Sequence, residues 1–475
     1  MIELSQNITD YIASLYGSEI AQKYFDFIKT GHTTYIRLND PYPSAEALLK
    51  KLNGYGVRLE KVHAIPDAYK ILSGVEILGK TLEYNLGKYY IQSLSSMIPP
   101  LMLSPKGSQT VLDLCSAPGS KATQIASLMG NTGTFITNEP QTDRIKMLVH
   151  NIDKLNIVNA GVIQYKGEWL SRLYDHHFDK ILVDAPCSAL GVLQKKEEVS
   201  KWWSKERVEK IAYLQNMILA AAVKMAKEGG EIVYSTCTIT PEENELIINH
   251  ALNKYPLEVI DIELPIKANE GFTSYNGVKL RSELSKARRI LPWEVDSEGF
   301  FIIKMRKTGR TEPAKPLEVK NNLSLLSYRD KPMKGYLKDI SLDFAIDENV
   351  WKDYRYLISK NDIYFIHKDW QDHNLSFFNR IGTRFGLIDK NNRAHLHSYA
   401  AQYFHKYIGK NIFEITDGSQ LKDYLNGGII RADVQSKDQQ VVKCGPYVLG
   451  TAAVVNNGIK SQYPKALRIH EISYY

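Results

Sequence analysis

Two apolar segments that each end in small residues and a cysteine constrain this chain more than any other feature. The first, FDKILVDAPC, runs from Phe178 to Cys187, and the second, GGEIVYSTC, ends at Cys237. Short apolar runs rich in branched residues and bounded by turn residues predict buried strands of a parallel sheet, here Lys180–Val183 and Ile232–Tyr234. Ligands bind at the carboxyl edge of such sheets, so both cysteines are candidate functional residues. Most free cysteines are simply small buried side chains, and position alone leaves both interpretations open.

A second strand-to-loop junction lies upstream in the segment VLDLCSAPGSKAT. It predicts a strand over Val111–Leu114, a tight loop over Ser116–Ser120 and a helix over Lys121–Met129. Small residues let the backbone approach a ligand closely, and a helix N-terminus favours negative groups. The loop has neither a GxGxxG pattern nor a Walker lysine–serine pair, which disfavours dinucleotides and triphosphates. The residues alone indicate a nucleotide-like cofactor, with a plain turn as the alternative.

The next predicted strand, in TGTFITNEP, ends at Glu139. A carboxylate at this place can accept hydrogen bonds from ribose hydroxyls, although a solvated loop glutamate would look the same. Strands and helices continue to alternate, with a long helix over 204–227, which predicts an α/β domain with a parallel sheet. After the second cysteine, Thr240 and Glu243 have the spacing of a capping box around Pro241.

The chain of 475 residues exceeds one hydrophobic core of about 250–300 residues, so several domains are expected. Residues 1–31 have one apolar stripe and predict one helix, and 86–100 predict the start of another. The last part is rich in tyrosine and short β runs, which suggests a small barrel, and Lys460, Lys465 and Arg468 give it a basic edge. We therefore expect an N-terminal α/β lobe of a kind that often binds RNA (1–85), an α/β domain that carries both cysteine loops (86–306), a linker (307–335) and a basic, tyrosine-rich C-terminal region suited to binding RNA (336–475).

Charge and cysteine content restrict the class of protein. Lys and Arg number 60 against 53 Asp and Glu, a net charge of +7 that favours an anionic partner. The four cysteines form no CxxC pair, which argues against a metal site and against a disulfide framework. We see no signal peptide and no apolar run near the roughly 20 residues of a membrane span. A cytoplasmic protein without metal and without a membrane anchor is expected.

The chain resembles the Sun-type RNA (cytosine-5) methyltransferases in the motifs LDLCSAPGSKAT, TNE, VDAPCSALG, YSTCT with PEENE, and RRILPWEVDSEGFFIIKMRK. Its closing GIKSQYPKALR is similar to the PUA-like tail of the bacterial RsmF-like branch, which acts on ribosomal RNA. The resemblance implies an S-adenosylmethionine-dependent Rossmann-like core between a small N-terminal α/β lobe and a PUA-like β-rich domain. It also implies methylation of carbon 5 of a cytosine in RNA, most readily in small-subunit ribosomal RNA, with transfer RNA as an alternative.

The resemblance assigns roles to three residues near the paired cysteines. Cys237 is the nucleophile, Cys187 assists product release, and Asp184 hydrogen-bonds the cytosine near N3. Carbon 5 of cytosine is a poor nucleophile, so a thiolate must first add to carbon 6, and a base must later remove the carbon-5 proton. A base stacked in RNA must leave its stack to be reached.

The resemblance also places the cofactor. Its methionine part would lie against Cys115, Ser116, Ala117, Pro118, Gly119, Ser120 and Lys121, its ribose at Glu139, and Asp184 would border it. The family usually has Asp-Gly after the third strand, where this chain has Lys166-Gly167.

Two other functions compete with this interpretation. An RNA-binding or ribosome-assembly factor with weak or lost catalysis is suggested by Lys166, but such a factor needs neither Cys187 nor Cys237. A DNA cytosine methyltransferase uses the cysteine after the fourth strand and would not need Cys237. The sequence leaves the oligomeric state open, and we take a monomer as the default.

Overall fold

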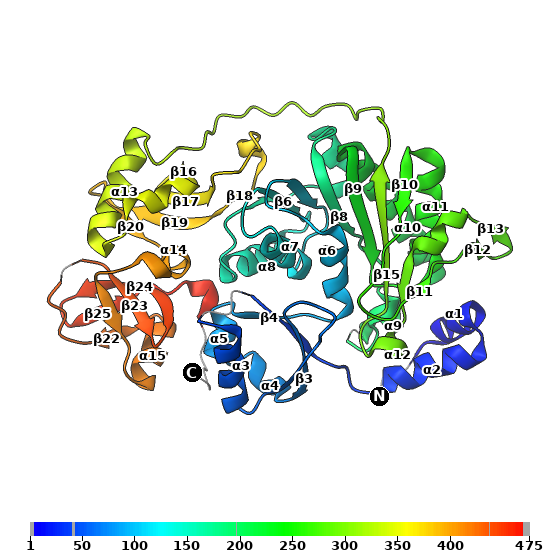
Figure 1. Cartoon of the computed structure of the whole chain (residues 1–475), viewed down its shortest axis with the longest axis horizontal. Helices are drawn as coiled ribbons and strands as arrows, with labels where there is room; N and C mark the ends of the chain where they lie inside the picture. Colours follow the sequence, from blue (N-terminus) through cyan, green and yellow to red (C-terminus); the bar gives the residue numbers. More distant parts are fainter. Residues whose placement is uncertain (1–3, 40–42, 196, 437, 469–475) are drawn as a thin grey trace.

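A large mixed sheet forms the centre of the protein, with an N-terminal lobe and a C-terminal β-rich half packed around it (Figure 1). The computed structural model describes residues 4–39, 43–195, 197–436 and 438–468. Within these residues, no helix has both the length and the apolar character needed to cross a membrane.

The central sheet carries the alternating strands predicted from the sequence. In spatial order its strands are β11 (Asn269–Glu270), β14 (Arg288–Ile290), β15 (Phe300–Lys307), β9 (Ala226–Thr236), β8 (Phe178–Asp184), β5 (Thr110–Asp113), β6 (Thr134–Asn138), β7 (Ala160–Ile163) and β18 (Arg380–Ile381), and β10 (Leu257–Ile260) pairs with β15. The strands from β9 to β7 run parallel, whereas β15 is antiparallel to β9. From β5 the chain adds β6 and β7 on one side and then β8 and β9 on the other side. A ligand-binding crevice is expected at this switch, between β5 and β8.

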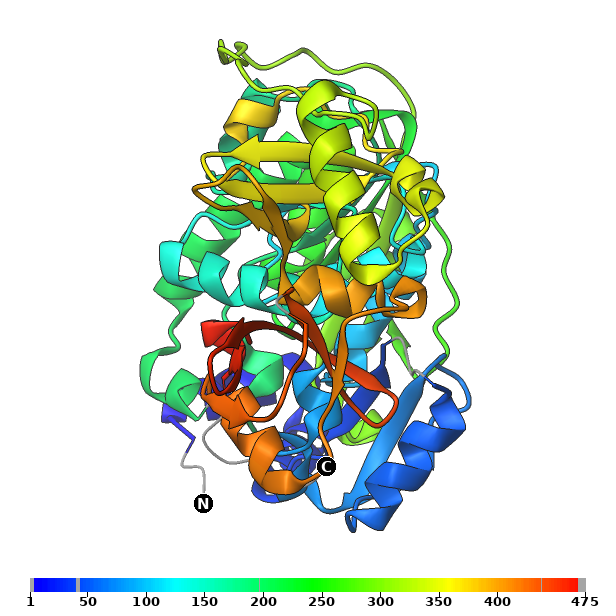
Figure 2. The same ribbon diagram turned by 90° about the vertical axis from the view of Figure 1, so that its left-hand side faces the viewer.

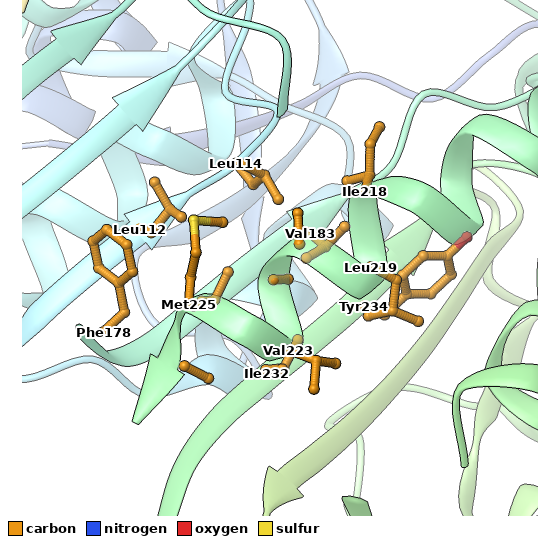
Figure 3. Close-up of a cluster of buried hydrophobic side chains, with 14 of the residues drawn as sticks. Leu112, Leu114, Phe178, Val183, Ile218, Leu219, Val223, Met225, Ile232 and Tyr234 are labelled. Atoms are coloured by element: carbon orange, nitrogen blue, oxygen red, sulfur yellow. The ribbon is translucent and has the colours of Figure 1, made fainter. Parts of the chain in front are cut away.

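Helices cover both faces of this sheet. They are α6 (Ile98–Leu103), α7 (Ser120–Leu128) and α8 (Thr142–Lys154) on one face, and α10 (Lys205–Met225) and α11 (Glu245–Lys254) on the other. Successive strand residues point to opposite faces. Val183 of β8 therefore packs with Ile218 and Leu219 of α10 (Figure 3), while its neighbour Leu182 packs with Ile125 of α7. Burial on both faces explains why these strands are apolar throughout.

The N-terminal lobe differs from two predictions. Its antiparallel sheet has the order β2 (Arg58–Lys61), β3 (Ala68–Ser73), β1 (Tyr35–Leu38) and β4 (Tyr89–Ile91), with α3 (Ala45–Gly54) and the short α4 (Val75–Leu78) and α5 (Leu82–Asn85). The single helix predicted over 1–31 is divided into α1 (Gln6–Tyr16) and α2 (Ser18–Lys29), because Gly17 has a φ of +81°. Residues 1–3 of that prediction lie outside the described residues.

The helix predicted to begin within 86–100 starts only near the end of that segment. This segment supplies β4, which pairs with β1, and α6 begins only at Ile98. The prolines at 99 and 100 fit the first turn of a helix, where the missing N–H groups need no partner, so they start α6 instead of ending a helix.

The C-terminal half contains two sheets where the sequence suggested one small barrel. The first has the order β16 (Tyr354–Ser359), β17 (Asp362–His367), β19 (Thr383–Ile388) and β20 (Ala394–Leu396), and the second β21 (Ile412–Glu414), β23 (Gln440–Cys444), β24 (Tyr447–Val455), β25 (Gly458–Ser461) and β22 (Ile429–Arg431). Helix α14 (Ser398–Tyr403) lies between them and contacts β19 and β24, which keeps the sheets apart. Figure 2 shows one sheet above the other, in front of the central sheet.

Residues 308–330 cross from β15 to α13 (Lys331–Phe344) along the upper edge of the molecule in Figure 1, without a regular helix or strand. The remaining elements are α9 (Glu198–Trp202), α12 (Pro292–Val295), α15 (Gly418–Leu425) and the hairpin of β12 (Ser274–Tyr275) and β13 (Val278–Lys279). Strand β18 joins the C-terminal half to the edge of the central sheet. The domain boundaries given above stay a prediction.

Candidate active site

The two cysteine loops leave adjacent parallel strands at the same level. Asp184 at the end of β8 lies in register with Ser235 of β9. The loops that follow bring Cys187 Sγ to 3.3 Å from Cys237 Sγ. The contact with Cys237, burial and the charge of Glu243 raise the pKa of the Cys187 thiol. Two thiols from separate strands therefore share one place at the carboxyl edge of the sheet.

Backbone contacts at Gly191 hold these loops against each other. Its N–H donates to the carbonyl oxygen of Cys237 at 3.0 Å, and its own carbonyl accepts from Gly299 N at 2.8 Å. A Cβ atom at Gly191 would lie 2.4 Å from Gly299 O and 2.8 Å from Cys237 O. Only glycine allows the backbone at position 191 to lie so close to Gly299 and Cys237. No motif in the sequence had marked Gly191 as a functional residue.

The predicted capping box after Cys237 is not formed. Pro241–Glu243 is a single 3₁₀ turn, and α11 begins at Glu245. The Glu243 carboxylate turns toward the other cysteine loop, where it accepts a hydrogen bond from Ser188 N at 2.7 Å. Thr240 donates its hydroxyl to the same carboxylate at 2.7 Å.

Asp184 connects the cysteine loops to the loop after β5. Its Oδ2 accepts from Lys121 Nζ at 2.8 Å, and its Oδ1 accepts from Ser235 Oγ at 2.9 Å. Burial on its own lowers the pKa of Lys121, but the Asp184 charge and hydrogen bond outweigh it and raise that pKa above its ordinary value. The Lys121 ammonium also lies 4.9 Å from the centre of the Phe300 ring.

The loop between β5 and α7 contains the predicted cofactor residues Cys115, Ser116, Ala117, Pro118 and Gly119, and the predicted residues Ser120 and Lys121 open α7. Ser116 ties it to β6, because its N–H donates to Asn138 O at 2.9 Å and its Oγ accepts from Asn138 N at 3.1 Å. Gly119 precedes α7 with a φ of +114°. From α8, Asn151 donates to Pro118 O at 2.8 Å. The loop is thus fixed by the next strand and by the next helix.

Three carboxylates surround this loop. Burial comes first among the causes that raise the pKa of Cys115, followed by the charges of Asp113, Asp184 and Glu139. Asp113, 1% exposed, has a pKa raised to about 7 by burial and by the Asp184 charge. The sequence analysis missed Asp113, although an acidic residue inside an apolar strand is itself a signal.

Glu139 lies at the end of β6 and is 1% exposed. Its Oε1 accepts from Gln141 N at 2.9 Å, and its Oε2 lies 3.3 Å from Arg144 Nη1. A ribose at this carboxylate must therefore share it with Arg144, another residue that the sequence analysis did not single out.

Lys166 follows β7, as expected, at the place where the family usually has an acidic residue. Its Nζ lies 4.7 Å from the centre of the Trp169 ring, and Trp169 is 48% exposed. The charge is thus directed onto an aromatic face that the sequence analysis did not identify.

Comparisons with known proteins identify the family. The family model described as 16S rRNA methyltransferase RsmB/F matches residues 100–306, and that of the methyltransferase RsmF PUA domain matches 410–469. The chain is 30% identical over 439 residues to a ribosomal RNA small subunit methyltransferase F of Shewanella oneidensis, covering 91% of this chain and 90% of that protein. This protein belongs to the RsmB/F methyltransferase family.

This chain is also similar to archaeal proteins. It is 40% identical over 229 residues to the tRNA (cytosine(49)-C(5))-methyltransferase of Pyrococcus abyssi, covering 48% of this chain and 73% of that protein. A crystal structure of a methyltransferase homolog from Pyrococcus horikoshii covers 64% of this chain and all of that one, with a TM-score of 0.54 and 29% identity.

These findings confirm the predicted family, fold class, enzyme class and cofactor: the RsmB/F protein is an RNA cytosine-C5 methyltransferase that uses S-adenosylmethionine. The residues around the β5–α7 loop fit this cofactor. Its sulfonium and ammonium groups are cationic and its ribose carries hydroxyls, and Asp113, Asp184 and Glu139 supply the carboxylates that such groups require.

Proposed function

We propose that this enzyme methylates carbon 5 of a cytosine in small-subunit ribosomal RNA through a covalent adduct with Cys237. The 3.3 Å approach of Cys187 and Cys237, beside Asp184, carries this proposal. The choice of RNA rests on the Shewanella oneidensis relative, which matches this chain over nearly its full length, whereas the Pyrococcus abyssi relative named for transfer RNA covers about half of it.

The reaction uses both thiols in turn. The Cys237 thiolate adds to carbon 6, which makes carbon 5 electron-rich, and Asp184 hydrogen-bonds the base near N3 to support this polarisation. Bound S-adenosylmethionine supplies the methyl group. Removal of the carbon-5 proton then restores the double bond as the bond between Cys237 Sγ and carbon 6 breaks, and Cys187 assists this release. The contact between the sulfurs allows Cys187 to reach the same base.

The cofactor is held by the groups around the β5–α7 loop. Cys115 to Lys121 lie against its methionine part, Glu139 binds its ribose, and Asp184 borders both cofactor and base. The Lys121–Asp184 ion pair supports this arrangement because it fixes the loop relative to the cysteines. A water-poor pocket there would strengthen each of these interactions.

The N-terminal lobe and the C-terminal half bind the RNA on either side of the target base. A cleft with about 940 Å³ of empty space lies where α8 meets the C-terminal half, and its lining includes Arg380, Arg384, Lys465 and Arg468. Of the tyrosines that line the same cleft, Tyr364 is half-buried, whereas Tyr399 and Tyr463 are buried. Cations beside aromatic rings suit a phosphate backbone with exposed bases. A monomeric state and a cytoplasmic location remain predictions.

Mapping the modified nucleotide tests the substrate. The purified enzyme, tritiated S-adenosylmethionine and either small-subunit ribosomal RNA, assembled small subunits or bulk transfer RNA are combined, and 5-methylcytosine is located by bisulfite sequencing. We expect one cytosine of the small-subunit RNA to be modified. Modification of transfer RNA alone would show that the assigned substrate is wrong. Binding of ribosomal RNA without methylation, despite bound cofactor, would favour an assembly factor instead.

A further inference from the structure

One buried carboxylate spans the two cysteine loops. Glu243 is 0% exposed and accepts four hydrogen bonds. The donors are Ser188 N at 2.7 Å, Ser188 Oγ, Thr240 Oγ1 at 2.7 Å and Gln215 Nε2 at 3.2 Å. Ser188 follows Cys187 directly, and Thr240 lies three residues after Cys237. The carboxylate therefore hydrogen-bonds to each cysteine loop within three residues of its cysteine.

We propose that Glu243 is a positioning residue of the methyl transfer reaction, whose carboxylate clasps the Cys187 loop to the Cys237 loop and sets the separation of the two sulfurs. The inference rests on the roles proposed above for the two cysteines. The hydrogen bonds that join Glu243 to the two loops do not depend on those roles.

Further hydrogen bonds hold the residues on both sides of Cys187. Gln215 donates to Pro186 O at 2.8 Å with the same nitrogen that reaches Glu243, so α10 supports the residue before the thiol while Glu243 holds the residue after it. Ser188 Oγ also lies 3.0 Å from Thr238 Oγ1, which joins the loops a second time. Movement of the Glu243 carboxylate would thus release both sides of Cys187.

The chemistry of the group argues for a role beyond filling space. Burying an ionised carboxylate costs several kcal/mol unless hydrogen bonds compensate. All four partners of Glu243 donate and favour its ionised form, whereas burial is the larger effect and raises the pKa of this carboxyl above its ordinary value. Its charge also contributes, after the contact with Cys237 and burial, to the raised pKa of Cys187.

Glu243→Gln tests the clasp because it keeps the volume but replaces one acceptor by an amide donor facing hydroxyl donors. We expect kcat to fall about ten- to a hundred-fold, since small misplacements of reacting groups cost this much. The KM for RNA and the Kd for S-adenosylmethionine should be unchanged. The rate at which diamide, which takes up the two thiol hydrogens, links Cys187 to Cys237 should fall as well, measured by peptide mass spectrometry.

The neighbouring Glu242→Gln is the matched control. The Glu242 carboxylate accepts from the hydroxyls of Tyr11 and Tyr275, both at 2.6 Å, so this variant should methylate and cross-link like the wild type. Ser188→Ala, which removes one hydroxyl and leaves the backbone donor, should lower both rates less than Glu243→Gln and decides the matter if Glu243→Gln does not fold.

Wild-type kcat and cross-linking rates in Glu243→Gln and Ser188→Ala would overturn the proposal. So would losses that merely follow the fraction of unfolded protein in thermal denaturation. Because the cross-linking rate needs no RNA, a wild-type enzyme that methylates no cytosine would refute the proposed function while leaving the clasp testable.

Discussion

Lys121 Nζ and Asp184 Oδ2 lie 2.8 Å apart and join the cofactor loop to the first cysteine loop. Lys121 is buried and Asp184 half-buried, so the pair lies at the inner end of the site, between the two loops. Any displacement of the first turn of α7 is thereby transmitted to Asp184, the residue proposed to hydrogen-bond the base.

Cys237→Ala should lower methylation on the order of 10⁴-fold or more, the scale seen when a covalent nucleophile is removed. RNA affinity should remain near normal, because the thiol makes one small contact in a large interface. Methyl incorporation and a filter-binding assay measure the two quantities. Cys444→Ala, at the end of β23 in the C-terminal half, serves as the control and should be fully active. Full activity of Cys237→Ala would remove the nucleophile assignment.

Cys187→Ala should instead leave the enzyme bound covalently to RNA. Without the second thiol near Cys237 Sγ, product release is slowed while addition to carbon 6 still occurs. A denaturing gel should show a slow band that requires both RNA and S-adenosylmethionine. The double variant Cys187→Ala with Cys237→Ala should lose that band. If Cys187→Ala turns over normally and no band accumulates, Cys187 has no part in release.

Asp113→Asn should change how stability depends on pH. Burial and the Asp184 charge raise the pKa of Asp113 to about 7 in the folded protein, whereas the unfolded chain loses this proton near the ordinary pKa of 3.8. The folded state therefore binds the extra proton between these values, and the unfolding free energy contributed by this group falls as pH rises through that window, by at most about 4 kcal/mol. Asparagine does not titrate, so Asp113→Asn should not lose this part of the unfolding free energy as pH rises.

Urea unfolding from pH 4.5 to 7.5 measures the difference between wild type and Asp113→Asn. The variant should lose less stability as pH rises. Asp143→Asn, at an exposed carboxylate on α8, should follow the wild-type profile. Parallel profiles for wild type and Asp113→Asn would show that Asp113 ionises normally in the folded protein.

The sequence predicted those parts of the site that depend on local pattern. The strands before Cys187 and Cys237 are short apolar runs with abrupt ends, and the loop after β5 is marked by its small residues. The sequence could not show the partner of Glu243. Its spacing from Thr240 satisfies a capping rule locally, but Ser188, which donates to Glu243 with both its N–H and its hydroxyl, lies 55 residues away in sequence. Only the pairing of β8 with β9 brings that donor within reach.

Tertiary contacts likewise overrode two local patterns. The segment 86–100 reads as helix from its composition, yet Tyr89–Ile91 adds to an open strand edge of the N-terminal lobe. Asp113 reads as an interruption of a strand, and only the neighbouring Asp184 and Glu139 show that acidic groups gather around one loop. Side chains from three separate strands make that environment, and no single segment of the sequence contains it.

Lys166→Asp should tighten binding of S-adenosylmethionine. In the wild type the Lys166 ammonium lies over Trp169, at the position where the family usually carries an aspartate near the adenine. An aspartate there restores an acceptor for the adenine amino group, a hydrogen bond that contributes about 1 kcal/mol, or roughly five-fold in Kd. Isothermal titration calorimetry with wild type, Lys166→Asp and the exposed control Lys146→Asp measures this effect, and the control should bind like the wild type. Weaker binding in Lys166→Asp would mean that the ammonium over Trp169 itself supports the cofactor, and that this chain has replaced the acidic residue of its family by a different contact.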